Sequence, residues 1–284
     1  MRIIGIGDNV VDRYINNRIM FPGGNAVNFV VYAKKLGADA AYMGFIANDK
    51  EGRLVKESLE SMDIDVSISP LVDGLATERC DVVLNDGDRV FQGCTYGEGE
   101  WKPFTMNDDQ VKLLSEYDVV HCGCYANMED EIYKLKDVDA IRTYDFSAED
   151  EYRTEEYLDK VCPYIDIALF SAEEMNDDEI LDLQKKVYDK GPKLVLVTNG
   201  KKGQKLWDGK NQYDGVVKLV EAVDTMGAGD SFFTAFVVTL AGKGKALDEL
   251  SEADYNDAFA KAANFSAEIC LVDGAFGFGT KYED

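Results

Sequence analysis

The sequence has few residues of the kinds that mark nucleic-acid-binding or membrane proteins. Its 284 residues include one histidine, five prolines and no run of 18 or more apolar residues that could span a bilayer. Basic residues are also scarce, with 30 of them compared with 54 acidic residues. The resulting net charge of −24 repels the phosphates of nucleic acid. We therefore expect neither a nucleic-acid nor a membrane partner.

The cysteines lack the paired spacing of a metal site. Six of them are scattered along a sequence that opens without a basic leader or a small-residue cleavage site, so we expect a cytoplasmic protein with no secretory signal. Cysteines in such a compartment stay reduced, and we predict six free thiols. Cys122 and Cys124, two residues apart in an apolar stretch, are predicted to share a strand face and pack in the core.

Both standard nucleotide-binding loops are missing. No Gly-Lys pair is followed by Ser or Thr, which excludes a P-loop. The early stretch "GIGDNV" supplies Gly5 and Gly7 but places Val10 where a dinucleotide fold needs its third glycine. A nucleotide would have to be held in another way, and the acidic surplus means that backbone amides and a divalent cation would have to help.

Short apolar runs alternate with amphipathic stretches along most of the chain. This rhythm predicts an α/β fold with a largely parallel sheet, covered by helices on both faces, and ligands bound at the carboxyl ends of its strands. We expect strands near the N-terminus and at 40–49, 117–125, 140–147, 165–171 and 193–200, a hairpin-like pair just after 203, and helices at 25–37, 52–63, from 177 onward, 229–241 and about 253–270.

The rhythm breaks between about residues 70 and 104. The stretch "ATERCDVVLNDGDRVFQGCTYG" alternates in the manner of strands, with "NDGD" as a hairpin turn. We predict one domain over 1–284, with a small β-sheet lid formed by about 12–20 and 71–104. No internal repeat or long linker divides the chain. The exposed strand edges of such a lid predict a two-fold homodimer through it.

The stretch "DTMGAGDSF", which begins at residue 224, combines a flexible turn with a helix start. Gly227, Ala228 and Gly229 let a ligand approach their amides closely, and the helix after them directs free N–H groups and its dipole at the turn. An anion such as a transferred phosphate fits there, and Asp230 could accept a proton from a hydroxyl. The alternative is an ordinary glycine turn with an acidic helix start.

Two motifs carry a resemblance to a known family. "DTMGAGDSF" looks like the C-terminal signature of the PfkB, or ribokinase-like, sugar kinases, and "FPGGNAVN" at 21–28 resembles their N-terminal signature. The shorter stretches "GIGDNVVDRY", "LNDGDRVFQG" and "YDFS" resemble the fructoselysine 6-kinase subgroup. The resemblance implies a three-layer α/β/α fold with a β lid, and transfer of the γ-phosphoryl group of ATP to the 6-hydroxyl of a ketose derivative such as fructoselysine. The alternatives are a fructokinase, another sugar or nucleoside kinase, and a binding protein without turnover.

The resemblance also implies roles for individual residues. Asp230 would be the general base, and the amides of Gly227, Ala228 and Gly229 would form an anion hole. The residues that match sugar-holding positions, or lie beside them, are Asp12, Gly23, Gly24, Asn25 and Asn28. The residues that match the nucleotide-binding region are Thr198, Gly200, Gly203, Thr225 and Asn264.

The predicted metal site departs from the family pattern. Where the family often has Asn-x-x-Glu, this chain has Ser171-Ala172-Glu173-Glu174. Glu174 keeps the acid and is predicted to organise Mg²⁺ through water, because Mg²⁺ dehydrates reluctantly. The alternative for it is a solvated acidic helix start. The resemblance also suggests that backbone carbonyls in the loops around Asp224 and Gly274 bind K⁺.

Two further side chains carry weaker signals. His121 lies inside an apolar strand without a partner in sequence, so we predict a packed structural role rather than a catalytic one. Arg89, in the predicted hairpin of the lid, could bind a substrate carboxylate or a phosphate, and it could equally be a surface charge.

Overall fold

The main body is built on one twisted sheet of eight strands. The computed structural model describes residues 1–85 and 87–283. Within them the strand order is β14-β13-β12-β11-β10-β9-β1-β4, parallel from β4 to β12 and antiparallel for the last two strands. The strands are β1 Arg2–Ile6, β4 Asp39–Met43, β9 Val119–Gly123, β10 Ile141–Asp145, β11 Ile167–Ser171, β12 Leu194–Thr198, β13 Gln204–Trp207 and β14 Gln212–Gly215.

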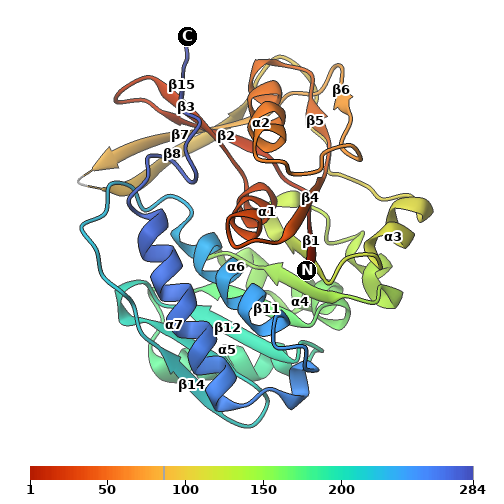
Figure 1. The fold of residues 1–284 in the computed structure, drawn as a ribbon, viewed down its shortest axis with the longest axis vertical. Coiled ribbons are helices and arrows are strands. Elements are labelled where there is room, and N and C mark those ends of the chain that lie inside the picture. Colours follow the sequence, from red (N-terminus) through yellow and green to blue (C-terminus); the bar gives the residue numbers. More distant parts are fainter. Residues whose placement is uncertain (86, 284) are drawn as a thin grey trace.

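Helices cover both faces of this sheet, which explains why its central strands are apolar at successive positions. One apolar cluster joins the sheet to α1, α6 and α7, and another joins the opposite face to α3, α4 and α5. Figure 1 shows α6 and α7 side by side. None of the helices in the described ranges is long and apolar enough to cross a membrane. The helices are α1 Asn25–Lys35, α2 Lys50–Ser61, α3 Asp108–Leu114, α4 Glu155–Val161, α5 Asp177–Tyr188, α6 Ala228–Ala241 and α7 Glu252–Ile269.

A second, five-stranded sheet lies against α1 and α2 at the top of Figure 1. Its order is β15-β3-β2-β7-β8, so strands from both predicted lid segments pair with each other. The C-terminal strand β15, which pairs with β3, was not predicted, and Asp86 in the predicted "NDGD" turn lies outside the described residues. We call this sheet the lid. Its strands are β2 Val10–Tyr14, β3 Ile19–Gly23, β7 Glu78–Asn85, β8 Asp88–Tyr96 and β15 Thr280–Lys281; a separate pair is β5 Ile46–Ala47 with β6 Leu71–Val72.

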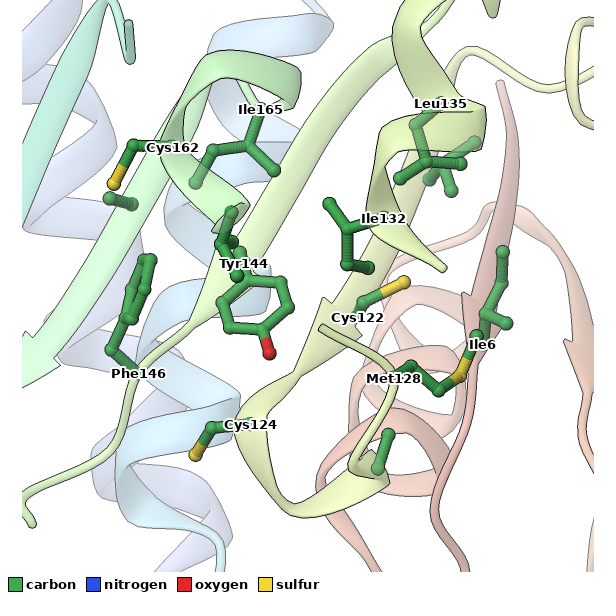
Figure 2. Close-up of a cluster of buried hydrophobic side chains, with 14 of the residues drawn as sticks. Ile6, Cys122, Cys124, Met128, Ile132, Leu135, Tyr144, Phe146, Cys162 and Ile165 are labelled. Carbon is green, nitrogen blue, oxygen red and sulfur yellow. The ribbon is translucent and has the colours of Figure 1, made fainter. Parts of the chain in front are cut away.

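The prediction of six free thiols is wrong for two of them. Cys80 of β7 and Cys94 of β8 form a disulfide, because the antiparallel register of the two strands places them directly opposite each other. The spacing of the cysteines in the sequence does not reveal this strand register. The other cysteines are buried thiols, and Figure 2 shows Cys122 and Cys124 within an apolar cluster that includes Tyr144, as the core prediction requires.

Candidate active site

The candidate site lies where three adjacent strands of the main sheet end beneath the lid. Asp8 follows β1, Gly123 ends β9 and Asp145 ends β10, and these strands are neighbours in the sheet. The first turns of α1 and α6 meet at the same place and bring Asn25 and Asp230 to it. This is the edge of a parallel sheet at which ligands bind in α/β folds.

Two asparagines of α1 orient the carboxylate of Asp230. The Nδ2 atom of Asn28 donates to Oδ2 of Asp230 at 2.7 Å, and Nδ2 of Asn25 donates to Oδ1 at 3.0 Å. Burial raises the pKa of Asp230, and the hydrogen bond from Asn28 opposes this rise. The Oδ1 atom of Asn28 is itself buried and without a partner among the described residues. It is therefore available to accept a hydrogen bond from a ligand hydroxyl.

Asn25 is in turn held by the only histidine of the sequence. Its Oδ1 atom lies 2.8 Å from Nε2 of His121, and its Nδ2 atom also donates to Asp145 at 2.8 Å. Because Nδ2 donates to two carboxylates, Oδ1 must be the acceptor, so Nε2 of His121 carries the proton and Nδ1 accepts from Thr143 at 2.9 Å. Burial lowers the pKa of His121 to about 3, which keeps the ring neutral. His121 is packed as predicted, and it also positions Asn25.

Two further carboxylates, those of Asp8 and Asp145, accept hydrogen bonds from Asn25. Burial raises the pKa of Asp8 to about 6, against hydrogen bonds from the backbone amides of Ala26 and Asn25. Burial also raises the pKa of Asp145 to about 7, with a further contribution from the nearby charge of Asp230. Asp8 and Asp145 were not predicted as site residues, although both stand at the end of an apolar run in stretches that carried the family resemblance.

Asp12 of β2 is buried close enough to Arg89 and Asp230 to feel their charges, and it receives no hydrogen bond from any residue that the structure describes. Burial raises its pKa to about 7, and attraction to Arg89 opposes the rise. A buried carboxylate with unused acceptor atoms is costly unless something pairs with it. Asp12 is thus prepared to accept hydrogen bonds from ligand hydroxyls.

The two glycines of "FPGG" make room for these carboxylates. A Cβ atom on Gly23 would lie 2.8 Å from Oδ2 of Asp12, and one on Gly24 would lie 2.9 Å from Oδ2 of Asp8. Gly24 also has φ +112°, a conformation that side chains with a Cβ rarely adopt. Sugar binding by these two glycines stays a prediction; in the structure their lack of a side chain leaves room for the two acids.

The turn before α6 offers free amide donors. Gly227 has φ +74°, and a Cβ there would lie 2.1 Å from the hydroxyl of Tyr32, so only glycine fits. The amide of Ala228 donates to the carbonyl of Thr225 at 3.2 Å, whereas the amides of Gly227 and Gly229 find no acceptor within residues 1–85 and 87–283. These two groups, at the positive end of the α6 dipole, can bind an anion.

Arg89 reaches from the lid toward this turn. Its Nη1 atom donates to the carbonyl of Thr225 at 2.8 Å, and its Nε atom is buried without a partner in the described chain. Its positive charge opposes the raised pKa values of both Asp12 and Asp230. Arg89 therefore extends from the lid to the turn before α6, and its binding role stays a prediction.

The residues predicted to bind the nucleotide lie farther along the same edge of the main sheet. Thr198 ends β12, and the positive φ angles of Gly200 and Gly203 shape the loop that follows it. Asn264 lies on α7, where its Oδ1 atom accepts a hydrogen bond from Lys218 at 2.9 Å. Thr225 precedes the turn before α6, and its carbonyl accepts from Arg89.

The predicted metal residue is part of an ion pair. Glu174 accepts from Arg153 at 2.8 Å, and this hydrogen bond lowers the pKa of its carboxyl, so it is ionised at neutral pH. Arg153 also donates to the carbonyl of Ser171 at 2.5 Å. The Ser171 side chain lies 3.1 Å from the hydroxyl of Thr198, so it contacts the end of β12 and not the carboxylate of Glu174.

Asp224 ties three segments together beneath the turn. Its carboxylate accepts from the hydroxyl of Tyr14 at 2.5 Å, from the amide of Gly274 at 2.9 Å and from the amide of Met226 at 2.9 Å. The side chain joins the lid, the turn before α6 and the loop after α7. The two loops suggested above as a K⁺ site, around Asp224 and Gly274, are therefore adjacent.

The model of the pfkB family carbohydrate kinases matches residues 5–277. The chain belongs to this family. This pfkB kinase is 30% identical over 283 residues to the fructosamine kinase FrlD of Bacillus subtilis, across 99% of this chain and 95% of that protein. It is 34% identical over 233 residues to the fructoselysine 6-kinase of Escherichia coli, across 82% and 86% of the two chains. The family resemblance drawn from the two signatures is confirmed, and the protein is an ATP-dependent carbohydrate kinase.

Solved structures confirm the fold of this pfkB kinase. The fructokinase with bound ATP from Xylella fastidiosa superposes with a TM-score of 0.80 at 17% identity, over 97% of this chain and 94% of that one. The ribokinase of Arabidopsis thaliana complexed with ribose and ATP gives 0.76 at 19% identity over the same shares. The predicted ribokinase-like three-layer α/β/α architecture with a small β-sheet is therefore correct.

The contact between β9 and Asn25 yields a test of the site geometry in this pfkB kinase. Gly123 has φ −139°, which any residue can adopt, but a Cβ atom there would lie 2.4 Å from Oδ1 of Asn25. We expect Gly123→Ala to displace Asn25 and lower kcat by about 10- to 100-fold, because small displacements of positioning groups have effects of this size. Steady-state kinetics would measure it, with Gly242→Ala at the end of α6 as the control. Normal turnover in Gly123→Ala would mean that the position of Asn25 is unimportant.

Proposed function

We propose that this kinase transfers the γ-phosphoryl group of ATP to the 6-hydroxyl of fructoselysine. The observation that carries the chemistry is the carboxylate of Asp230, oriented by Asn25 and Asn28 beside the free amides at the start of α6. The choice of acceptor is supported by the two relatives named fructosamine kinase and fructoselysine 6-kinase, at 30% and 34% identity.

In the proposed reaction, Asp230 takes the proton of the 6-hydroxyl as that oxygen bonds to the γ-phosphorus. The bond from the γ-phosphorus to the oxygen that bridges it to the β-phosphorus breaks, and ADP leaves with that oxygen. The amides of Gly227 and Gly229 stabilise charge on the transferred group, and the guanidinium of Arg89 adds positive charge from the lid. Positioning and electrostatics provide most of the rate enhancement in such transfers.

The sugar would lie between Asp230 and the lid. Asp12 and the free Oδ1 atom of Asn28 are the unused acceptors there, and both suit hydroxyl groups. Closure of the lid over the sugar would exclude water, which limits transfer of the phosphoryl group to water. Thr198, Gly200, Gly203, Thr225 and Asn264 would contact the nucleotide.

Mg²⁺ would be held beside the nucleotide loop by Glu174. Its carboxyl is ionised and its side chain is 60% exposed, and only one of its oxygens is engaged by Arg153, so it fits a contact made through water. The ion would offset negative charge on the β- and γ-phosphates. The loops joined by Asp224 would hold K⁺ in the same proposal.

Comparing acceptors side by side tests the proposed function. With fructoselysine, fructose and ribose supplied separately with ATP, coupled detection of ADP should give the highest kcat/KM with fructoselysine. A strong preference for free fructose would replace the proposal with a fructokinase. Sugar binding by calorimetry without ADP formation from any acceptor would favour a binding protein that has lost turnover.

A homodimer through the lid stays a prediction. The outer strand of the lid, β8, has one unpaired edge within the described residues, and its side chains Val90 and Phe91 are exposed. Such an edge is suited to pairing with a second copy.

A further inference from the structure

The imidazole of His121 is fully buried in β9 and held on its faces and edges by other side chains. Its exposed fraction is 0%, and the ring of Phe29 on α1 stacks on it with 3.9 Å between the ring centres. The ring of Phe233 on α6 meets it edge-on at 5.8 Å. These contacts fix the plane of the imidazole, so its two nitrogen atoms point in fixed directions: Nδ1 to Thr143 of β10 and Nε2 to Asn25 of α1.

Two arrangements of protons satisfy the hydrogen bonds of this buried imidazole, because a neutral ring can carry its proton on either nitrogen. In the first network, Nε2–H donates to Oδ1 of Asn25 and Nδ1 accepts from the hydroxyl of Thr143. The NH2 group of Asn25 then faces the carboxylates of Asp145 and Asp230. In the second network, Nδ1–H donates to Thr143, whose hydroxyl turns to the carbonyl of Val120 at 3.5 Å, and the amide of Asn25 is reversed.

The two networks present different atoms to the acids of the site. In the first, Nδ2 of Asn25 donates to Asp145 at 2.8 Å and to Asp230 at 3.0 Å. In the second, Oδ1 would take that place, and acceptors that face each other repel unless a carboxyl carries a proton. The other charged groups near the proposed base are the same in both networks: Asp8, Asp12 and Arg89. A protonated Asp230 cannot take the proton of a substrate hydroxyl, so the direction of this buried amide decides whether the proposed base can act.

We propose that His121 is a positioning residue for phosphoryl transfer, and that its Nε2–H group holds Asn25 in the orientation of the first network. The proposal rests on the proposed role of Asp230 as the base. Thr143 contributes by donating its hydroxyl proton to Nδ1, which leaves the ring proton on Nε2. Among the residues that the structure describes, the two ring nitrogens contact only Thr143 and Asn25, so His121 acts through Asn25 and not on the substrate. Burial lowers the pKa of His121, and the uncharged ring donates to Asn25 without adding a positive charge.

The position of the ring proton can be observed directly, because the chain has a single histidine. In untagged protein labelled with ¹⁵N-histidine, two-dimensional NMR of the ring nitrogens gives one pair of signals, and both belong to His121. We expect the wild-type protein at neutral pH to carry the proton on Nε2 and none on Nδ1. A proton on Nδ1 would overturn the proposal, because Asn25 would then be reversed. This measurement requires neither a substitution nor an acceptor sugar.

Two substitutions separate the two hydrogen bonds of the ring. The amide nitrogen in His121→Gln can take the place of Nε2 and donate to Asn25, whereas the shorter side chain in His121→Asn places its amide beside Thr143. Both variants lose the stack with Phe29, so each is the stability control of the other, and denaturant unfolding would compare them. We expect kcat to fall about 10- to 100-fold in His121→Asn and to stay within about threefold of wild type in His121→Gln, with KM for ATP unchanged in both. Equal kcat values in the two variants would overturn the proposal.

The variant Asn25→Ala shows whether His121 acts through Asn25. In that background His121→Asn should cause no further fall in kcat, because the amide that it orients is gone. A further fall as large as in the wild-type background would overturn the proposed route.

The same assays separate this proposal from the proposed function. They use whichever acceptor the wild-type enzyme phosphorylates best, so a preference for fructose over fructoselysine overturns the proposed function and leaves the comparison of His121 variants intact. Slow turnover of Asp230→Asn together with equal kcat in His121→Gln and His121→Asn would support the proposed base and defeat the role of His121. Near-normal turnover of Asp230→Asn would defeat both.

Discussion

Replacing Asp230 with asparagine should lower kcat by at least ~10²-fold, the lower end of what a general base contributes. The amide cannot accept the hydroxyl proton. It matches the carboxylate in shape and keeps one oxygen that can accept from Asn25 or Asn28, while its NH2 group replaces the other acceptor. ATP binding should be nearly unchanged, because the amides of Gly227 and Gly229 are untouched. Steady-state kinetics with ADP detection would measure the loss, and calorimetry with a non-hydrolysable ATP analogue would measure nucleotide affinity.

The pH profile gives the same experiment a second readout. Since burial raises the pKa of Asp230 and the base acts in its ionised form, kcat/KM should rise with pH through a value above the ordinary aspartate range. Burial also raises the pKa of Asp8, Asp12 and Asp145, so the observed midpoint belongs to the group of carboxylates. Asp248→Asn, at an exposed position, is the control. Turnover near the wild-type value in Asp230→Asn would exclude the assigned role.

The fold could be predicted from the sequence because most of its elements are encoded locally. The parallel strands are apolar at successive positions, since helices cover both of their faces, and the lid strands alternate. The elements that escaped prediction are weakly encoded. α4, Glu155–Val161, is a single polar stretch of seven residues, and β15 is two residues that pair with β3 from the other end of the chain. The Cys80–Cys94 disulfide likewise depends on the register of two strands.

The site was predicted where its signal is local and missed where it depends on strand order. Asp230 and the glycine turn lie together in one short stretch, so their relation to the helix start could be read directly. The roles of Asp8, Asp145 and His121 arise because β1, β9 and β10 are neighbours in the sheet. Apolar periodicity shows that these strands exist but does not give their order. The network around Asn25 therefore required the structure.

We expect the buried acids of the site to lower the free energy of unfolding, and Asp12→Asn should show this effect most clearly. Burial raises the pKa of Asp12 to about 7 in the folded protein, from an ordinary value of 3.8. Between these values the folded state holds a proton that the unfolded state has lost, so the free energy of unfolding falls as pH rises from about 4 to about 7. Above that range the folded protein carries the charge of Asp12, which Arg89 offsets only in part, and the full loss of stability is present.

Removing the charge should therefore stabilise the protein at high pH and leave stability at low pH unchanged. Each pK unit corresponds to about 1.4 kcal/mol, and part of the gain is offset by lost attraction to Arg89 and by burial of the amide. We expect Asp12→Asn to raise the free energy of unfolding by about 1–3 kcal/mol at pH 8, with little change near pH 4. Denaturant unfolding at both pH values would measure it, with Asp88→Asn on the exposed outer strand of the lid as the control.

The same substitution should impair catalysis, because the unpaired acceptors of Asp12 are the groups available to sugar hydroxyls. We expect kcat/KM for the sugar to fall by about 10²-fold, with KM for ATP nearly unchanged, since a site built to hydrogen-bond a hydroxyl loses selectivity when its acceptor is replaced. A less stable variant at pH 8 would show that attraction between Asp12 and Arg89 outweighs burial. A more stable variant with full activity would show that Asp12 is buried without contacting the substrate. Greater stability together with weaker sugar binding would show that the charge of Asp12 destabilises the folded protein and is needed to bind the sugar.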